Sequence, residues 1–281
     1  MSRQEGGWPA TATLVIGQAR SQNRVFWRTP IAAFFTLVLP LVMMVLFNAL
    51  FDGVVETSIG EIPIRQFYTA GLAVFAAVSA TYTNLVNMIP IRRDEGILKR
   101  VRSTPLPPPI YLGGAVLSAL WIAVIGVVVM LGIAVIGYDL EIEPSKLPAA
   151  GLTFVIGISA FAALGLAVAA LVPSASAAPA VANATILPLA FVSNIFIALE
   201  DPPRWLEVIG DIFPLKHFAS AFQDAFNPLT DGAGFRWGDL AVIAAWGALG
   251  AVVAVRKFHW EPSVGATGRR SRRQPRVDAE A

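Results

Sequence analysis

Six apolar runs recur along this 281-residue sequence, each about as long as a helix that crosses a lipid bilayer. Such a helix needs about 20 residues, because each residue adds about 1.5 Å and the hydrocarbon core is about 30 Å thick. Only 14% of the residues are charged, against about 25% in soluble domains. The sequence therefore predicts an all-α polytopic membrane protein with six transmembrane helices, at residues 30–50, 67–89, 110–137, 147–172, 181–199 and 237–255. We expect the first run to be a retained anchor rather than a cleaved signal peptide.

Basic residues gather on one side of the predicted membrane. Sixteen of the 21 lysines and arginines precede the first run, lie between the second and third, or follow the sixth. The positive-inside rule then predicts a multi-pass protein of the cell membrane with both termini in the cytoplasm. Six spans meet this condition, whereas five or seven do not.

The segments outside the runs have patterns of their own. Residues 1–29 form a predicted cytoplasmic N-terminus, in which Arg20, Arg24 and Arg28 would share one face of a helix in the headgroup layer; a plain basic flank is the alternative. Residues 30–258 would form the transmembrane domain. Within it, the long aromatic segment 200–236 predicts short amphipathic helices in the outer leaflet, with a small soluble subdomain as the alternative. The basic tail 259–281 lacks apolar periodicity, so we expect it to be disordered.

The composition argues against several kinds of chemistry in this chain. Cysteine is absent, and only His217 and His259 offer imidazoles, so we expect no metal site, no catalytic residue and no disulfide. There is no Gly-x-x-x-x-Gly-Lys-Ser/Thr loop, so we expect no nucleotide site of its own. The runs contain no clear ionisable residue, which argues against a proton-coupled carrier. No cofactor and no nucleic-acid partner are expected for the chain itself.

Neutral polar side chains occur within two of the runs. They are Ser79, Thr83, Asn84 and Asn87 in the second run, and Asn183 and Asn194 in the fifth. Three of those in the second run recur every four residues, and the two asparagines of the fifth lie eleven residues apart, so each set would share one face of a helix. Such groups either form hydrogen bonds between helices or line a cavity. Their spacing leaves both interpretations open.

The loop at residues 90–109, between the second and third runs, carries a short amphipathic pattern. A helix from about residue 92 to residue 102 would place Ile97 and Val101 on one face with Leu98 beside them. Glu95 would pair with Lys99 four residues later. A helix of this kind is suited to docking in a groove of another protein. A plain basic loop is the alternative.

The motifs in and after this loop resemble those of type-2 ABC exporter permeases. They are Arg93-Asp-Glu-Gly96, the stretch Lys99-Arg-Val-Arg-Ser-Thr-Pro105 and Tyr111-Leu-Gly-Gly114; Phe213-Pro-Leu-Lys-His217 is similar to a proline-containing element of the same family. The resemblance extends over nearly the whole chain. It implies an export permease that catalyses no covalent reaction and works as a homodimer or heterodimer. Two copies of a separate ABC ATP-binding subunit would hold ATP and Mg.

The resemblance also implies roles for particular residues. The loop would be a coupling helix that fits a cleft on the ATPase, with contacts from Arg93, Glu95, Gly96, Ile97, Leu98, Arg100 and Val101. The second and fifth runs would border the translocation path, with the six polar residues as its lining. The chain is most similar to small drug-resistance and antibiotic-export permeases, which implies an apolar or amphipathic cargo. Polysaccharide and lipid exporters share the topology, and a membrane-embedded lipid enzyme is a more distant alternative. Three consecutive prolines at 107–109 depart from the pattern of many drug permeases.

Overall fold

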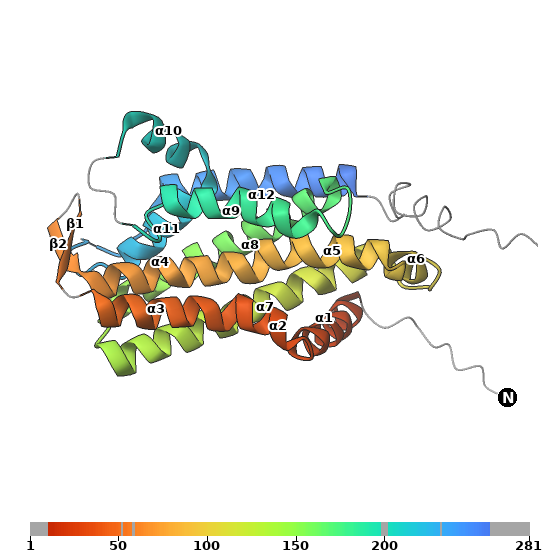
Figure 1. The fold of residues 1–281 in the computed structure, drawn as a ribbon, viewed down its shortest axis with the longest axis horizontal. Helices are drawn as coiled ribbons and strands as arrows, with labels where there is room; N and C mark the ends of the chain where they lie inside the picture. Colours follow the sequence, from red (N-terminus) through yellow and green to blue (C-terminus); the bar gives the residue numbers. More distant parts are fainter. Residues whose placement is uncertain (1–10, 52, 58–59, 198–201, 231, 259–281) are drawn as a thin grey trace, which may run out of the picture.

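The computed structural model describes residues 11–51, 53–57, 60–197, 202–230 and 232–258, which form an elongated helical bundle (Figure 1). By length and composition, five helical stretches within these residues are suited to crossing a membrane: Pro30–Leu50, Ile64–Asp94, Pro109–Tyr138, Pro144–Leu171 and Trp237–Lys257. They contain the first three predicted runs and the sixth, and all of the fourth except its last residue, Val172. The chain is thus an all-α polytopic membrane protein in its main architecture.

Two of these stretches are interrupted by wider, π-helical turns. The first consists of α2 (Pro30–Ala33), η1 (Phe34–Val38) and α3 (Leu39–Leu50), and the second of α4 (Ile64–Val78), η2 (Ser79–Thr83) and α5 (Asn84–Asp94). The two π turns contact each other. The other three stretches are α7 (Pro108–Tyr138), the short η3 (Pro144–Lys146) followed by α8 (Leu147–Leu171), and α12 (Trp237–Lys257). A π turn keeps backbone hydrogen bonds within the helix, so both interrupted stretches stay continuous.

The fifth predicted run forms a shorter helix than expected. Helix α9 covers Ala178–Val192, and its 15 residues extend about 22 Å. It ends before Asn194, whose φ of 55° is incompatible with a right-handed helix. Residues 198–199, at the end of this predicted run, lie outside the described part of the chain. Six crossings therefore remain a prediction that depends on α9.

The remaining elements lie at the two ends of the bundle or beside it. They are α1 (Thr11–Trp27), the hairpin β1 (Val54–Thr57) and β2 (Gly60–Pro63), α6 (Ile97–Arg102), α10 (Arg204–Ile212) and α11 (Pro214–Ala225). Figure 1 shows the hairpin at one end and α6, near α1, at the other. The hairpin was not predicted; Val55 pairs with Ile62, and both bury their side chains against Phe67.

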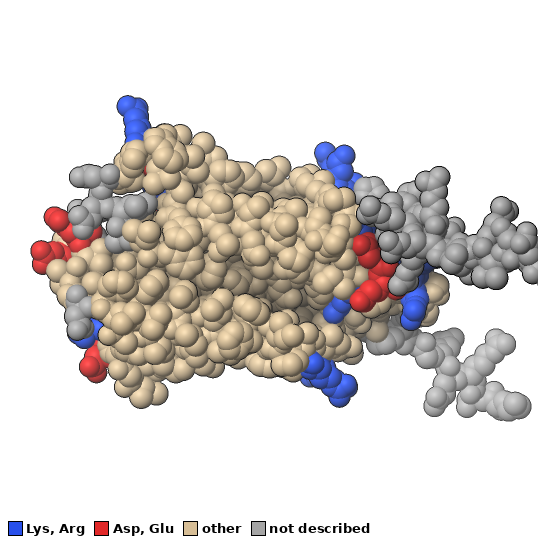
Figure 2. Space-filling view, in the orientation of Figure 1, with Lys and Arg blue, Asp and Glu red and all other residues tan. Residues whose placement is uncertain are grey.

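Charged side chains gather near the two ends of the face shown in Figure 2, with a broad uncharged belt between them. Helix α1 has a charged side and a buried side. Its three arginines, Arg20, Arg24 and Arg28, are exposed, whereas Gln22 and Phe26 are buried. The predicted helix of the N-terminal segment therefore exists from Thr11 onwards, and its place in the headgroup layer stays a prediction. The predicted disordered tail 259–281 lies outside the described residues.

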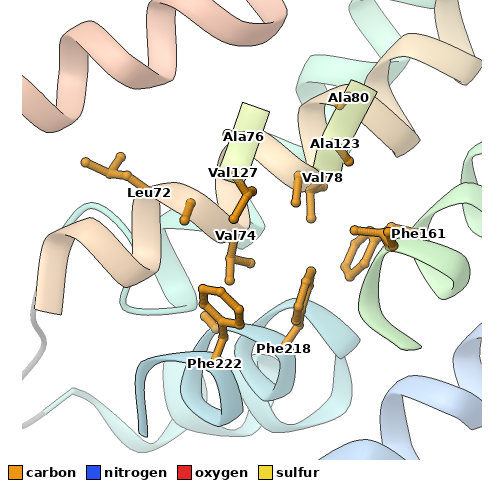
Figure 3. Close-up of a cluster of buried hydrophobic side chains, with 14 of the residues drawn as sticks. Leu72, Val74, Ala76, Val78, Ala80, Ala123, Val127, Phe161, Phe218 and Phe222 are labelled. Carbon is orange, nitrogen blue, oxygen red and sulfur yellow. The ribbon is translucent and has the colours of Figure 1, made fainter. Parts of the chain in front are cut away.

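The aromatic stripe of the segment 200–236 points into the bundle. Figure 3 shows Phe218 and Phe222 of α11 beside Val74 of α4, with Phe161 of α8 nearby. The rings of Phe161 and Phe218 stack with their centroids 6.0 Å apart. Two helices do form in this segment, α10 and α11, but the aromatic face of α11 belongs to the core rather than to a lipid-facing surface. Their location in the outer leaflet stays a prediction.

An ion pair and a buried hydrogen bond hold α11 and the residues after it against neighbouring elements. Arg236 donates to the carboxylate of Asp224 at 2.7 Å. Lys146, only 2% exposed, donates to the carbonyl of Asn227 at 2.8 Å and lies 2.7 Å from the Glu143 carboxylate. A buried ammonium group is tolerated because both partners compensate for its lost hydration.

Glycines allow α8 and α12 to pack closely. A Cβ atom added at Gly250 would lie 2.9 Å from the backbone nitrogen of Leu164 and 3.0 Å from the carbonyl carbon of Ala163. Backbone atoms cannot move aside as a flexible side chain can. Small residues at such crossings let transmembrane helices gain van der Waals contact.

We predict that Gly250→Ala destabilises the protein by about 1–3 kcal/mol, because the added methyl group overpacks the α8–α12 contact. Gly132→Ala in α7 is the matched control, since a Cβ there would meet no atom of the described residues within 4 Å. Thermal unfolding in detergent, followed by fluorescence-detected size exclusion, compares the two. Equal stability of both variants would contradict the packing argument.

Candidate functional site

The loop that resembles a coupling helix begins with a break in the helix at Gly96. Helix α5 ends at Asp94 and α6 begins at Ile97. Between them, Gly96 has a φ of +74°, a left-handed conformation that glycine adopts without steric cost. The single helix predicted for residues 92–102 is therefore two helices. Nothing in the described residues lies within 4 Å of a Cβ built at Gly96, so the backbone conformation, rather than crowding within the chain, requires the glycine.

The side chains of α6 divide between the bundle and the solvent. Leu98 is completely buried and packs in a cluster with Ile89, Tyr111 and Ala169. The sequence predicted that Leu98 offers an apolar contact to a partner. The structure corrects this prediction, because the chain itself covers the side chain. Ile97 and Val101 are half-buried, whereas Glu95, Lys99 and Arg100 are exposed. The surface that α6 offers is therefore mainly charged.

Arg93 and Asp94 bind the loop between α8 and α9. The guanidinium of Arg93 is buried and donates to the carbonyl of Val172 at 2.6 Å. The carboxylate of Asp94 accepts a hydrogen bond from the backbone N–H of Ala175 at 2.7 Å. Arg93, expected to contact a partner directly, is 5% exposed and instead joins two parts of its own chain.

Arg92 binds α1 and α7 from the neighbouring position. Its guanidinium donates to the side-chain oxygen of Gln22 in α1 and, at 2.8 Å, to the hydroxyl of Tyr111 in α7. The guanidinium carbon also lies 5.9 Å from the centre of the Tyr111 ring, within the range of a cation–π interaction. Three consecutive residues at the end of α5 thus connect α1, α7 and the α8–α9 loop. We name Arg92, Arg93 and Asp94 the α5 junction.

The polar residues of the second predicted run lie on and beside the π turn η2. Ser79, Thr83 and Asn87 are partly buried, as is Asn84. The amide of Asn87 donates to the carbonyl of Thr83 at 2.8 Å. The Thr83 hydroxyl and the side-chain oxygen of Asn87 are buried and have no hydrogen-bond partner among the described residues. Buried polar atoms without partners are uncommon in folded proteins, so each one calls for an explanation.

The two asparagines of the fifth predicted run do not share a helix face. Asn183 is an exposed residue of α9, but Asn194 follows the end of that helix, and its carbonyl accepts a hydrogen bond from Gln223 at 3.1 Å. The contact that does connect α9 with η2 was missed by the sequence analysis. The hydroxyls of Tyr82 and Thr185 lie 2.7 Å apart. The available signal was Tyr82 itself, which stands between two threonines of the second run and carries a hydroxyl that needs a partner within a membrane span.

Comparison with known proteins identifies the family. Residues 15–227 match the sequence profile of the ABC-2 type transporter family. The chain belongs to the ABC-2 type transporter family. Both the α5 junction and the polar residues of η2 and α9 lie within the matched region.

Three similar proteins are transport permeases by name. The chain is 29% identical over 235 residues, 79% of both proteins, to the daunorubicin resistance ABC transporter permease protein DrrB1 of Streptomyces coeruleorubidus. It is 25% identical to the putative transport permease YvfS of Bacillus subtilis, over 73% of this chain and 82% of that protein. It is 28% identical to the putative transport permease ycf38 of Cyanophora paradoxa, over 68% and 66%.

Membership defines the general role of this ABC-2 chain. It is a multi-pass membrane permease, and permeases of this family associate with an ATP-binding subunit. The three similar proteins are likewise named as transport permeases.

We predict that Asp94→Ala speeds hydrogen exchange at the Ala175 amide by about tenfold or more, because a hydrogen bond to a charged group is worth about 1.5–3 kcal/mol. Glu95→Ala is the matched control, since this neighbouring carboxylate is exposed. Hydrogen–deuterium exchange of the peptide spanning residues 172–177 measures the difference. Unchanged exchange in Asp94→Ala would show that the α5 junction does not hold the α8–α9 loop.

Proposed function

We propose that this chain is the permease subunit of an ATP-driven ABC exporter that moves an apolar or amphipathic compound out of the cell. The observation that carries the proposal is the α5–α6 turn. Its exposed face is charged, and the α5 junction behind it contacts α1, α7 and the α8–α9 loop. A displacement of α6 by an ATPase would therefore act on several helices at once.

The proposed topology has six crossings with both termini in the cytoplasm. Helix α9 would be the short fifth crossing, and α10 and α11 would follow on the outer side. This arrangement places α6 and its exposed basic residues Lys99 and Arg100 in the cytoplasm, as the positive-inside rule favours. The hairpin β1–β2 would then lie outside the cell.

The proposed assembly contains two permease chains and two ATP-binding subunits that hold ATP and Mg. The permease pair would be a homodimer or a heterodimer. Asn183 supports a pairing across α9, because an amide exposed on a membrane helix is disfavoured in lipid and gains from a protein or aqueous neighbour.

The proposed translocation path runs along η2 and α9. Ser79, Thr83, Asn84 and Asn87 offer hydroxyl and amide groups but no charge, and two of their buried atoms lack partners among the described residues. A neutral path suits a compound that is uncharged where it crosses, since a desolvated ion would need an opposite charge. The name of the DrrB1 relative supports a drug-like cargo.

An exporter of polysaccharide or lipid is the second candidate, because its permease has the same proposed topology. Stimulation of ATP hydrolysis in the purified complex separates the two. Amphipathic drug-like compounds should stimulate it, and stimulation by a lipid-linked saccharide alone would favour the second candidate. Transport by the permease without any ATPase would instead favour a secondary carrier.

We predict that Lys99→Glu and Arg100→Glu each weaken binding of the partner ATPase by about tenfold, because charged pairs at an interface rim control its association. Arg204→Glu in α10 makes the same charge change on an exposed residue at the opposite end of the bundle and serves as the control. Pull-down of the ATPase at matched expression measures the effect. Normal binding by both α6 variants would overturn the coupling-helix assignment. Leu98→Asp is not suitable for this test, since it should unfold the local packing.

The topology gives a separate prediction that relies on the absence of native cysteine. A single Ser145→Cys change should react with an impermeant maleimide in intact cells, whereas Ser103→Cys should react only after the membrane is opened. Both positions are exposed in the fold. Labelling of Ser103→Cys from outside would contradict the six-span orientation.

A further inference from the structure

Helix α1 packs on the first turns of α7 through two glycines. A Cβ atom at Gly114 would lie 2.6 Å from Cγ of Gln18 and 3.2 Å from the backbone nitrogen of Ala19. Gly113 lies near Val15 at the same contact. The Gly-Gly pair thus allows α1 to lie directly on α7. This close contact determines which faces of the two helices lie on either side of it.

A groove of about 330 Å³ follows one edge of this contact. Its walls come from one face of α1 and one face of α7, and they consist of Ile16, Ala19, Arg20, Asn23, Leu117, Ser118 and Trp121. The α1 residues are spaced at three and four positions, so they share one side of that helix. The groove is therefore a feature of how the two helices meet, and not of a loop.

The lining of the groove is amphipathic. Arg20 is an exposed cation on α1, whereas Leu117 and Trp121 are large apolar residues of α7 that are 38% and 54% exposed. Exposed tryptophan is typical of the boundary between headgroups and hydrocarbon. A molecule that fits this lining carries an anionic end and an apolar end.

Asn23 adds a specific requirement at the polar end. Its side-chain oxygen is buried and accepts no hydrogen bond from the described residues. An acceptor left in this state loses its hydration without compensation. A ligand in the groove that Asn23 lines would satisfy this oxygen with its own N–H or O–H group, once the side chain turns the oxygen towards it.

We propose that the α1–α7 groove binds a phospholipid whose headgroup carries a hydrogen-bond donor. The Arg20 guanidinium binds the phosphate, as arginine does with high geometric specificity. The Asn23 side-chain oxygen accepts a hydrogen bond from the ammonium of phosphatidylethanolamine or a hydroxyl of phosphatidylglycerol. One acyl chain lies over Leu117 and Trp121. Phosphatidylcholine satisfies the arginine but not the asparagine, because its trimethylated headgroup has no donor.

The geometry of α7 suits a lipid from the leaflet next to α1. Its 31 residues extend about 46 Å, which is longer than a hydrocarbon core of about 30 Å. The helix is thus long enough for its first turns, where α1 packs, to reach beyond the hydrocarbon, with Trp121 further along. Arg24 and Arg28 are also exposed on α1, but neither lines the groove. They attract anionic lipid without selecting it.

Native mass spectrometry of the full-length permease tests the proposal, after reconstitution in bilayers with equal amounts of phosphatidylethanolamine, phosphatidylglycerol and phosphatidylcholine. We expect the two donor-bearing lipids to be retained at least about tenfold more than phosphatidylcholine. Arg20→Gln should lower retention of all three lipids, and Asn23→Ala should remove the preference over phosphatidylcholine. Arg24→Gln is the matched control and should change neither.

Three outcomes would overturn the site. Equal retention of phosphatidylcholine and the other two lipids by the unaltered protein would show that Asn23 does not select the headgroup. An equal loss in Arg24→Gln and Arg20→Gln shows diffuse electrostatic attraction instead of a defined site. Unchanged lipid retention in Arg20→Gln would show that Arg20 does not bind the phosphate. Thermal unfolding of each variant, compared with the unaltered protein, separates loss of the site from loss of the fold.

Discussion

The hydrocarbon core offers the peptide backbone no hydrogen-bond partner, and the architecture of this chain follows from that constraint. The long membrane stretches remain helical even where they are interrupted, because η1 and η2 widen the helix without opening it. Pro90 and Pro188 occur inside α5 and α9 without ending either helix. The hairpin, the α5–α6 turn and the α8–α9 loop, which are not continuous helix, lie near the ends of the bundle. The charged groups that connect helices, such as the α5 junction, are consequently concentrated at those ends.

At the α6 end, the same residues serve the fold and the proposed coupling. The family pattern contains an arginine and a glutamate before the glycine, and the structure separates their roles. Arg93 faces inward to the Val172 carbonyl, whereas Glu95 faces outward. A partner that pushes on the exposed face of α6 would therefore meet a rigid connection to the α8–α9 loop, not a free loop. The contact with Val172 explains why Arg93, although charged, occupies a buried position in the chain.

The sequence predicted the long helices well, because their positions depend mainly on hydrophobicity and length. It failed where a single residue or a distant contact decides the outcome. Gly96 divides a segment that periodicity presents as one helix, and Asn194 lies beyond the end of α9 rather than on its face. Leu98 was expected on the outer surface because an amphipathic pattern does not say which environment its apolar face meets. The partners of Arg92, Arg93 and Asp94 are far away in sequence, so no local pattern could identify them.

The π turn η2 sets how the polar residues of the second stretch are aligned with the rest of the bundle. A π turn is equivalent to an α-helix with one additional residue, and one residue of an α-helix corresponds to a rotation of about 100°. Deletion of a single residue between Ser79 and Thr83 would therefore convert η2 into a regular α-helical turn and leave α5 close to its present orientation, whereas a deletion within α4 would turn α5, and with it the α5 junction, by that angle. The second stretch should accordingly tolerate the loss of one residue within η2 better than the loss of one residue in α4 or α5.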